Sequence, residues 1–103
     1  MIDEKSWGSY EVMGEEPGWM TVKVTLMPGH SMNYHSHKER DEVWVVLSGE
    51  GKTTVDGMEQ NIQKGDIISI AAGCKHTVCA YTELKLAEVQ IGDVIDVGDK
   101  VVY

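Results

Sequence analysis

The chain consists of short runs in which apolar and polar residues alternate, separated by residues that favour turns. Val22, Val24 and Leu26 alternate with polar neighbours, which is the pattern of a strand with one buried face. The run at 42–47 is rich in β-branched and aromatic residues and indicates a second, more deeply buried strand. Asp56-Gly57 lies between two further short runs and is a strong signal for a β-hairpin.

We predict at least seven strands at regular spacing along the chain, with glycines at the corners between them. The predicted strands are 22–26, 42–47, 53–55, 58–62, 67–70, 76–78 and 84–91. The predicted turns are Pro28-Gly29, Gly49-Glu50-Gly51, Asp56-Gly57, Lys64-Gly65-Asp66 and Ala72-Gly73. No segment shows a helical period, and evenly spaced short strands are typical of a sandwich or a closed barrel. The sequence therefore predicts an all-β fold.

The length of 103 residues suits one domain, so we expect residues 1–103 to form a single folded unit. The net charge of −8 argues against a nucleic-acid or anionic-membrane partner, because phosphate groups are bound by clustered Lys and Arg. An anionic substrate would have to be attracted locally, by a metal or by a few basic groups. No apolar run approaches the roughly 20 residues that span a bilayer, and the N-terminus lacks the features of a signal peptide. We therefore expect a cytoplasmic protein, in which Cys74 and Cys79 form no disulfide.

Three histidines and a glutamate form the pattern with the clearest chemistry. His35 and His37 are separated by one residue, so on a strand both side chains point to the same face. Glu42 begins the next apolar run and offers an oxygen ligand, and His76 lies on a distant strand that can close the site. Three imidazoles and one carboxylate suit one divalent transition metal (Fe, Mn, Co, Ni, Zn or Cu) and leave coordination positions open. His30 falls on the opposite strand face from His35 and is left out of the site.

The spacing of these residues resembles the two motifs of the cupin superfamily. A His-x-His pair alone is often a solvated pair on a strand, whereas the whole pattern is much more specific. The first motif is matched by Gly29, His35, His37, Glu42 and Gly49, and the second by Gly65, Ala71-Ala72-Gly73 and His76. Ala71 and Ala80 stand where the family usually has proline and asparagine, neither of which binds the metal. The resemblance implies a small cupin (jelly-roll) β-barrel that holds one divalent metal ion on His35, His37, Glu42 and His76.

Further segments narrow the resemblance: Trp7-Gly8-Ser9-Tyr10, Arg40-x-Glu42-x-Trp44 and Glu88-Val89-Gln90. They are similar to segments of type II mannose-6-phosphate isomerases and of the C-terminal domain of bifunctional mannose-1-phosphate guanylyltransferases. The resemblance implies metal-dependent aldose–ketose isomerisation of a sugar or sugar phosphate. Two departures bear on activity, because His35 stands where the family commonly has glutamine and Val102 where it usually has arginine. With no nucleotidyltransferase domain in the sequence, we do not expect GDP-mannose synthesis.

An isomerase of this type needs a general base and groups that hold the substrate. By residue type, the candidate bases are Glu39, Tyr34 and Glu88. The candidate substrate-binding residues are Arg40, Lys38 and Lys75, whose charges suit a phosphate, and Trp44, whose ring could pack on a sugar. The alternatives are ordinary solvated charges for the three basic residues and core packing for Trp44. We expect Trp7, Trp19 and Tyr10 to cover a barrel end or a dimer face.

Three functions remain open from the sequence. The first is a metal-dependent sugar or sugar-phosphate isomerase or epimerase. The second is a non-catalytic metal-binding module for a small molecule, which the missing arginine at position 102 favours. The third is an iron-dependent dioxygenase, because three histidines and a glutamate also hold Fe(II). In each case we expect a homodimer, because a small barrel with exposed strand edges gains by covering them.

Overall fold

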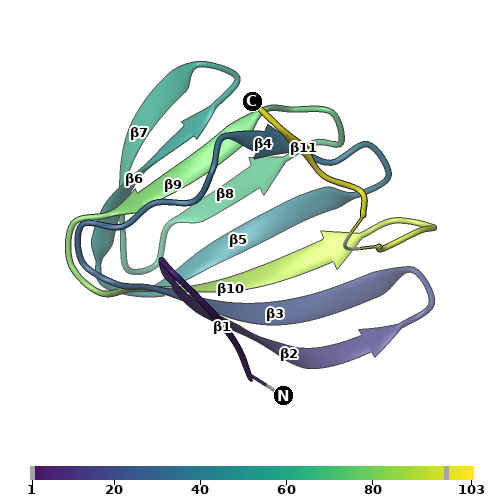
Figure 1. The fold of residues 1–103 in the computed structure, drawn as a ribbon, viewed down its shortest axis with the longest axis horizontal. Helices are drawn as coiled ribbons and strands as arrows, with labels where there is room; N and C mark the ends of the chain where they lie inside the picture. Colours follow the sequence, from purple (N-terminus) through teal and green to yellow (C-terminus); the bar gives the residue numbers. More distant parts are fainter. Residues whose placement is uncertain (1, 97) are drawn as a thin grey trace.

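The computed structural model describes residues 2–96 and 98–103, which form strands and turns (Figure 1). The strands are β1 (Ile2–Lys5), β2 (Gly8–Glu16), β3 (Trp19–Leu26), β4 (His35–Ser36), β5 (Asp41–Ser48), β6 (Glu50–Val55), β7 (Met58–Gln63), β8 (Ile67–Ile70), β9 (His76–Ala80), β10 (Leu84–Ile91) and β11 (Val101–Val102). The described residues contain no helix of the length and apolarity needed to cross a membrane.

The strands form two antiparallel sheets that face each other (Figure 1). The six-stranded sheet has the order β1-β2-β3-β10-β5-β8, and the five-stranded sheet has the order β11-β4-β9-β6-β7. Residues alternate between buried and less buried along the long strands, as a half-buried sheet requires. The buried apolar side chains of both sheets meet in one core, which comprises Val22, Val24, Leu26, Trp44, Val46, Ile62, Ile68, Ile70, Val78, Ala80, Leu84 and Leu86.

The prediction of an all-β fold is confirmed, and all seven predicted strands are present. The sequence did not predict β1, β2, β4 or β11. In β2 the acidic residues and Gly14 interrupt the alternation, and β4 and β11 are too short to show any. One predicted turn is wrong in part, because Glu50 and Gly51 already belong to β6.

Gly49 is one of the points at which the chain passes from one sheet to the other. It joins β5 of the six-stranded sheet directly to β6 of the five-stranded sheet. Its φ of +89° lies in the left-handed region, which glycine adopts without strain. A Cβ at this position would also overlap the backbone carbonyl of Glu83. The tight crossover therefore requires glycine for two reasons.

Candidate metal centre

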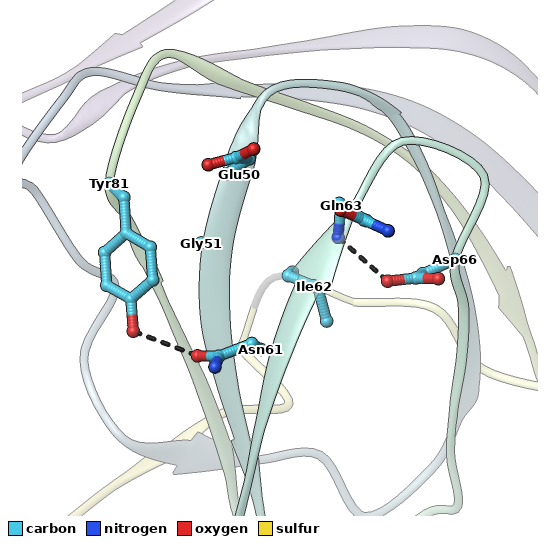
Figure 2. A pocket seen from close by; sticks show the side chains of 7 residues that line it. All are labelled: Glu50, Gly51, Asn61, Ile62, Gln63, Asp66 and Tyr81. Atoms are coloured by element: carbon cyan, nitrogen blue, oxygen red, sulfur yellow. Dashed lines mark hydrogen bonds between the residues drawn. The ribbon is translucent and has the colours of Figure 1, made fainter.

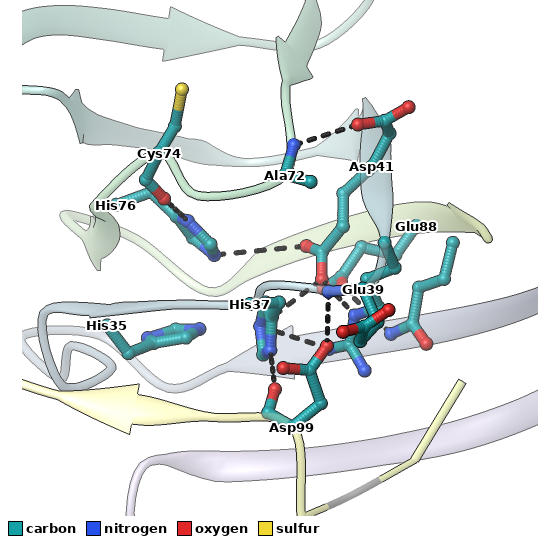
Figure 3. Close-up of polar contacts among 12 residues, drawn as sticks. His35, His37, Glu39, Asp41, Ala72, Cys74, His76, Glu88 and Asp99 are labelled. Atoms are coloured by element: carbon teal, nitrogen blue, oxygen red, sulfur yellow. Dashed lines mark hydrogen bonds and ion pairs between the residues drawn. The ribbon is translucent and has the colours of Figure 1, made fainter. Parts of the chain in front are cut away.

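Three histidines meet between the sheets (Figure 3). Glu42 lies close to two of them, His37 and His76. His35 of β4 and His76 of β9 are register partners, so their side chains point to the same face of the five-stranded sheet. His37 follows two residues after His35, and Glu42 comes from β5 of the other sheet. All four side chains are buried, with at most 6% of their surface exposed. The fold thus brings together the four residues that the motif resemblance names as metal ligands.

Each imidazole is held by a hydrogen bond from its Nδ1 to a backbone carbonyl. A carbonyl only accepts, so Nδ1 carries the proton and Nε2 keeps its lone pair. This tautomer is the one that binds a metal through Nε2, and the bond at Nδ1 fixes the orientation of the ring. The pairs are His35 with Asn33 (2.6 Å), His37 with Asp99 (2.6 Å) and His76 with Cys74 (3.0 Å).

The geometry fits a divalent transition metal. One potential ligand atom from each histidine lies within 4.8 Å of the other two. The Glu42 carboxylate adds Oε2 at 3.3 Å from His37 Nε2 and Oε1 at 3.9 Å from His76 Nε2. Ligands at right angles on a metal with bonds of about 2.1 Å lie about 3 Å apart. His76 Nε2 is buried without a hydrogen-bond partner among the described residues, which is costly unless a ligand satisfies it.

The histidines are neutral at physiological pH, as metal ligands must be. Burial lowers the pKa of His35 from 6.5 to about 4, although its hydrogen bond to the backbone acts in the opposite direction. Burial also lowers the pKa of His37 and of His76. The lone pairs of all three Nε2 atoms are therefore free of protons near pH 7.

Glu42 is an ionised carboxylate inside the protein. Burial alone would raise its pKa, but Arg40 and His37, together with the indole of Trp44, bring the pKa below its usual value. Arg40 Nε donates to Oε2 at 2.8 Å, and Trp44 Nε1 donates to Oε1 at 2.9 Å. Arg40 also donates through a terminal nitrogen to His37 Nε2 at 3.0 Å. A metal ion on His37 would compete with Arg40 for that lone pair and leave Arg40 its bond to Glu42.

Glu88 of β10 lies beside Glu42, and its pKa is shifted in the opposite direction. Its burial, the negative charge of Glu42 and the hydrogen bond between the two carboxyl groups raise the pKa of Glu88 well above its usual value. Gln90 donates its amide to Glu88 Oε1 at 3.3 Å. Two adjacent carboxyl groups with separated pKa values are the arrangement that supplies an anion and an acid to one site.

A cavity of about 470 Å³ opens in front of these groups, large enough for a small organic ligand. His35, His37, Glu42 and Glu88 line it, whereas His76 is not among the lining residues. The apolar lining comes from Trp7, Tyr10, Met20, Val22, Val24, Met32, Trp44 and Ile95, and the remaining polar lining from Lys5, Glu15, Asn33, Arg40, Gln90 and Lys100. Trp7 and Tyr10, expected at a barrel end or a dimer face, thus belong to the cavity wall.

The three candidate bases differ in whether they line the cavity. Only Glu88 lines the cavity. Glu39 is exposed, and only its backbone N–H takes part in a hydrogen bond near the site. The hydroxyl of Tyr34 accepts a hydrogen bond from the backbone of Gly57, away from the cavity.

Of the four substrate-binding candidates, two line the cavity and two do not. Arg40 and Trp44 line the cavity, although Trp44 is only 1% exposed and packs edge-on against His76, with 5.6 Å between ring centroids. Lys38 and Lys75 are exposed and do not line the cavity, and Lys75 Nζ lies 4.3 Å from the ring centroid of Tyr103. The alternatives of core packing for Trp44 and solvated charge for the two lysines describe their observed surroundings.

The last residues of the chain contribute side chains that the sequence did not predict. Asp99 accepts hydrogen bonds from the backbone N–H groups of Lys38 (2.9 Å) and Glu39 (2.8 Å), and its own carbonyl holds His37. Lys100 lines the cavity. The signal in the sequence that could have found them is the family-like closing segment 99–102, which contains both residues. Val102 is the register partner of His35, so an arginine there would start from the same sheet face.

A second hollow of about 390 Å³ lies on the outside, along β6 and β7 (Figure 2). Its lining includes Glu50, Asp66 and the pair in which Tyr81 donates its hydroxyl proton to Asn61 at 3.2 Å. None of the predicted metal ligands lies in it. The hollow is therefore separate from the histidine-lined cavity, with which it shares no lining residue.

Comparison with known proteins identifies the family. The model of the cupin domain family matches residues 22–90, a span that contains all four predicted metal ligands. The chain belongs to the cupin family. Among solved structures, an RmlC-like cupin from Shewanella frigidimarina shares the fold with a TM-score of 0.82, at 22% identity over 89% of this chain and 83% of that one.

Two other comparisons name enzymes. The chain is 28% identical to mannose-1-phosphate guanylyltransferase of Escherichia coli K12 over 99 residues, which are 94% of this cupin but only 21% of the relative. It therefore spans about a fifth of the length of that curated relative. Salicylate 1,2-dioxygenase from Pseudoaminobacter salicylatoxidans shares the fold at a TM-score of 0.70 and 19% identity, over 73% of this chain and 20% of that one.

Proposed function

We propose that this cupin binds one divalent transition metal and acts on a sugar or sugar phosphate by aldose–ketose isomerisation. The observation that carries the proposal is the convergence of three proton-free Nε2 atoms and the Glu42 carboxylate beside a cavity of small-ligand size. The sugar-phosphate part draws on the similarity to a relative whose name states that it acts on mannose 1-phosphate. It also draws on the resemblance to type II mannose-6-phosphate isomerases.

His35, His37, Glu42 and His76 would hold the metal, and the donor set suits Zn, Fe, Mn, Ni or Co. When bound, the metal would polarise the carbonyl and hydroxyl oxygens of the substrate and stabilise the charge that develops on them. The residues around it would keep the ligands in place. The three backbone carbonyls fix the imidazoles, and Trp44 and Arg40 fix the carboxylate.

Glu88 would move the proton between neighbouring carbons of the substrate. It is the only candidate base that lines the cavity, and it lies beside the predicted ligand Glu42. Its ionised carboxylate, which the raised pKa makes a stronger base, would take a proton from one carbon and return it to the next. The Gln90 amide at Oε1 would orient the group.

The test is to measure the metal content and the conversion of mannose 6-phosphate to fructose 6-phosphate on the same samples. We expect wild-type protein to hold metal and turn over, and Glu88→Gln to keep its metal while losing at least about a hundredfold in rate. Glu39→Gln is the matched control, because that carboxylate is exposed and outside the cavity. Metal-loaded wild-type protein without turnover would contradict the isomerase, and a Glu88→Gln variant of full activity would contradict the role of Glu88.

Two alternatives remain as outcomes of this test. Metal without turnover would favour a binding module, which Val102 in place of the family's arginine already supports. Oxygen uptake by the Fe(II)-loaded protein would favour a dioxygenase, for which the three-histidine set and the apolar wall formed by Trp7, Met20 and Met32 are suitable.

A further inference from the structure

The cavity differs in charge from the rest of the chain. The sequence has 9 Lys and Arg against 17 Asp and Glu. The cavity, in contrast, is lined by three basic residues, Lys5, Arg40 and Lys100, and three acidic ones, Glu15, Glu42 and Glu88. The cavity is therefore less acidic than the chain as a whole, and a cation in it that no carboxylate balances would attract an anion.

Two of the three cavity cations are already balanced by carboxylates. Arg40 is bound to Glu42 through Nε at 2.8 Å. Lys5 Nζ lies 3.2 Å from Asp3 Oδ2, where both side chains are more than 40% exposed. No ion pair joins Lys100 to any carboxylate, Glu15 included, in the part of the chain that the structure describes. Lys100 is therefore the unbalanced cation of the cavity.

Lys100 also lies on the metal side of the cavity. It follows Asp99, whose carbonyl and carboxylate bind His37 and the turn after it. It precedes β11, which pairs with the strand that carries His35. Lys100, His35 and His37 line the same cavity. A ligand that reaches these two histidines therefore lies in the cavity that Lys100 also lines.

We propose that Lys100 binds the anionic end of a small organic ligand, a phosphate or a carboxylate, whose oxygen-bearing carbons face the histidines. The carbon skeleton then packs against the apolar wall that contains Trp7, Met20 and Met32. The assignment deepens the proposed function by naming the charge of the substrate. It rests on that function only for the end that faces the metal ligands.

The experiment is calorimetric titration of the metal-loaded protein with mannose 6-phosphate, gluconate and uncharged mannose. Wild-type protein is compared with Lys100→Met and with Lys75→Met, a control in which the lysine is exposed on Tyr103 outside the cavity. We expect Lys100→Met to weaken the binding of an anion by about tenfold, as for one lost charge-assisted hydrogen bond. Mannose binding and metal content stay unchanged, and Lys75→Met behaves as wild type. Tighter binding of mannose 6-phosphate than of gluconate assigns a phosphate, and the reverse order assigns a carboxylate.

The outcomes separate this inference from the proposed function. Equal anion affinity in wild-type protein and Lys100→Met would overturn the role of Lys100, as would wild-type protein that binds neither anion. Anion binding that depends on Lys100 in a protein without metal or isomerase activity would support the inference while the proposed function fails. Loss of anion binding in Lys75→Met to the same extent would also contradict a specific role for Lys100.

Discussion

At the scale of single residues, the geometry of the candidate site depends on the residues that hydrogen-bond to the predicted ligands as much as on the ligands themselves. Asp99 is the clearest case, since one residue supplies a carbonyl for His37 and a carboxylate for the backbone of Lys38 and Glu39. It therefore holds the end of the chain against the turn that follows His37. Partners of metal ligands tune the affinity for the metal, commonly by ten- to a hundredfold.

We accordingly expect Asp99→Ala to weaken metal binding by about tenfold, because the turn after His37 loses both of its side-chain anchors. Competition with a chelator of known affinity measures the effect. Asp93→Ala is the control, since Asp93 is exposed and makes no side-chain hydrogen bond among the described residues. Equal affinities for the two variants would show that the carboxylate of Asp99 does not position His37.

The histidines also make a prediction for acid stability. In the metal-free protein, burial lowers the pKa of His35 to about 4, whereas the unfolded chain keeps a value of about 6.5. Between these values the unfolded state binds the proton that the folded state excludes, so the free energy of unfolding falls as the pH falls from about 6.5 to 4. The full shift is worth up to about 3 kcal/mol.

Chemical denaturation of metal-free wild-type protein and of His35→Gln across this range measures the effect. Glutamine does not titrate, so the variant should lose less stability on acidification, by up to about 3 kcal/mol. His37 and His76 remain in both proteins, so the difference between the two curves reports mainly on His35. Parallel curves for the two proteins would contradict a buried, neutral His35.

At the scale of elements, the sequence predicted the strands that carry a clear alternation and missed those that do not. The strands from β5 to β10 were predicted to within a few residues, and with them the positions of Glu42 and His76. The motif spacing alone was enough to predict the metal cluster. The return of Asp99 and Lys100 to the site could not be predicted, because it depends on the pairing of β11 with β4, far apart in sequence and two residues long.

The crossover at Gly49 gives a test at this scale. Alanine at position 49 would adopt an unfavourable φ and overlap the carbonyl of Glu83, whereas Gly65, at φ +93°, has open space around it. We expect Gly49→Ala to lower the free energy of unfolding by at least about 2 kcal/mol, and clearly more than Gly65→Ala, which carries the backbone strain alone. Similar losses in the two variants would show that the close approach of Gly49 to Glu83 contributes little.

At the scale of the whole molecule, the outer face of the six-stranded sheet carries an apolar patch over β5, β10 and β8. Val43 and Val45 of β5 pair with Val89 and Ala87 of β10, and Ile67 of β8 continues the row. The lysines of this face form ion pairs within the chain, Lys23 with Glu11 and Lys85 with Glu83. A second copy of an acidic chain can approach most easily where the surface is neutral and apolar.

We therefore expect a homodimer through this face, which complements the argument from exposed strand edges. Light scattering during size-exclusion chromatography should give the mass of two chains for wild-type protein and of one chain for Ile67→Lys. Ile67 is 67% exposed, so the monomer should tolerate the charge. Met58→Lys, at a 78% exposed position in the β6–β7 hairpin, is the control and should stay dimeric. A monomeric wild-type protein would contradict this expectation.

The most direct test of the whole account is the metal content of purified wild-type protein and of His37→Ala, measured by elemental analysis after reconstitution. We expect one transition-metal ion per wild-type chain and a sharp loss in the variant, with circular dichroism showing that the variant keeps its β structure. Wild-type protein that takes up no metal, or a folded His37→Ala variant that keeps the full metal content, would contradict the proposed centre on His35, His37, Glu42 and His76.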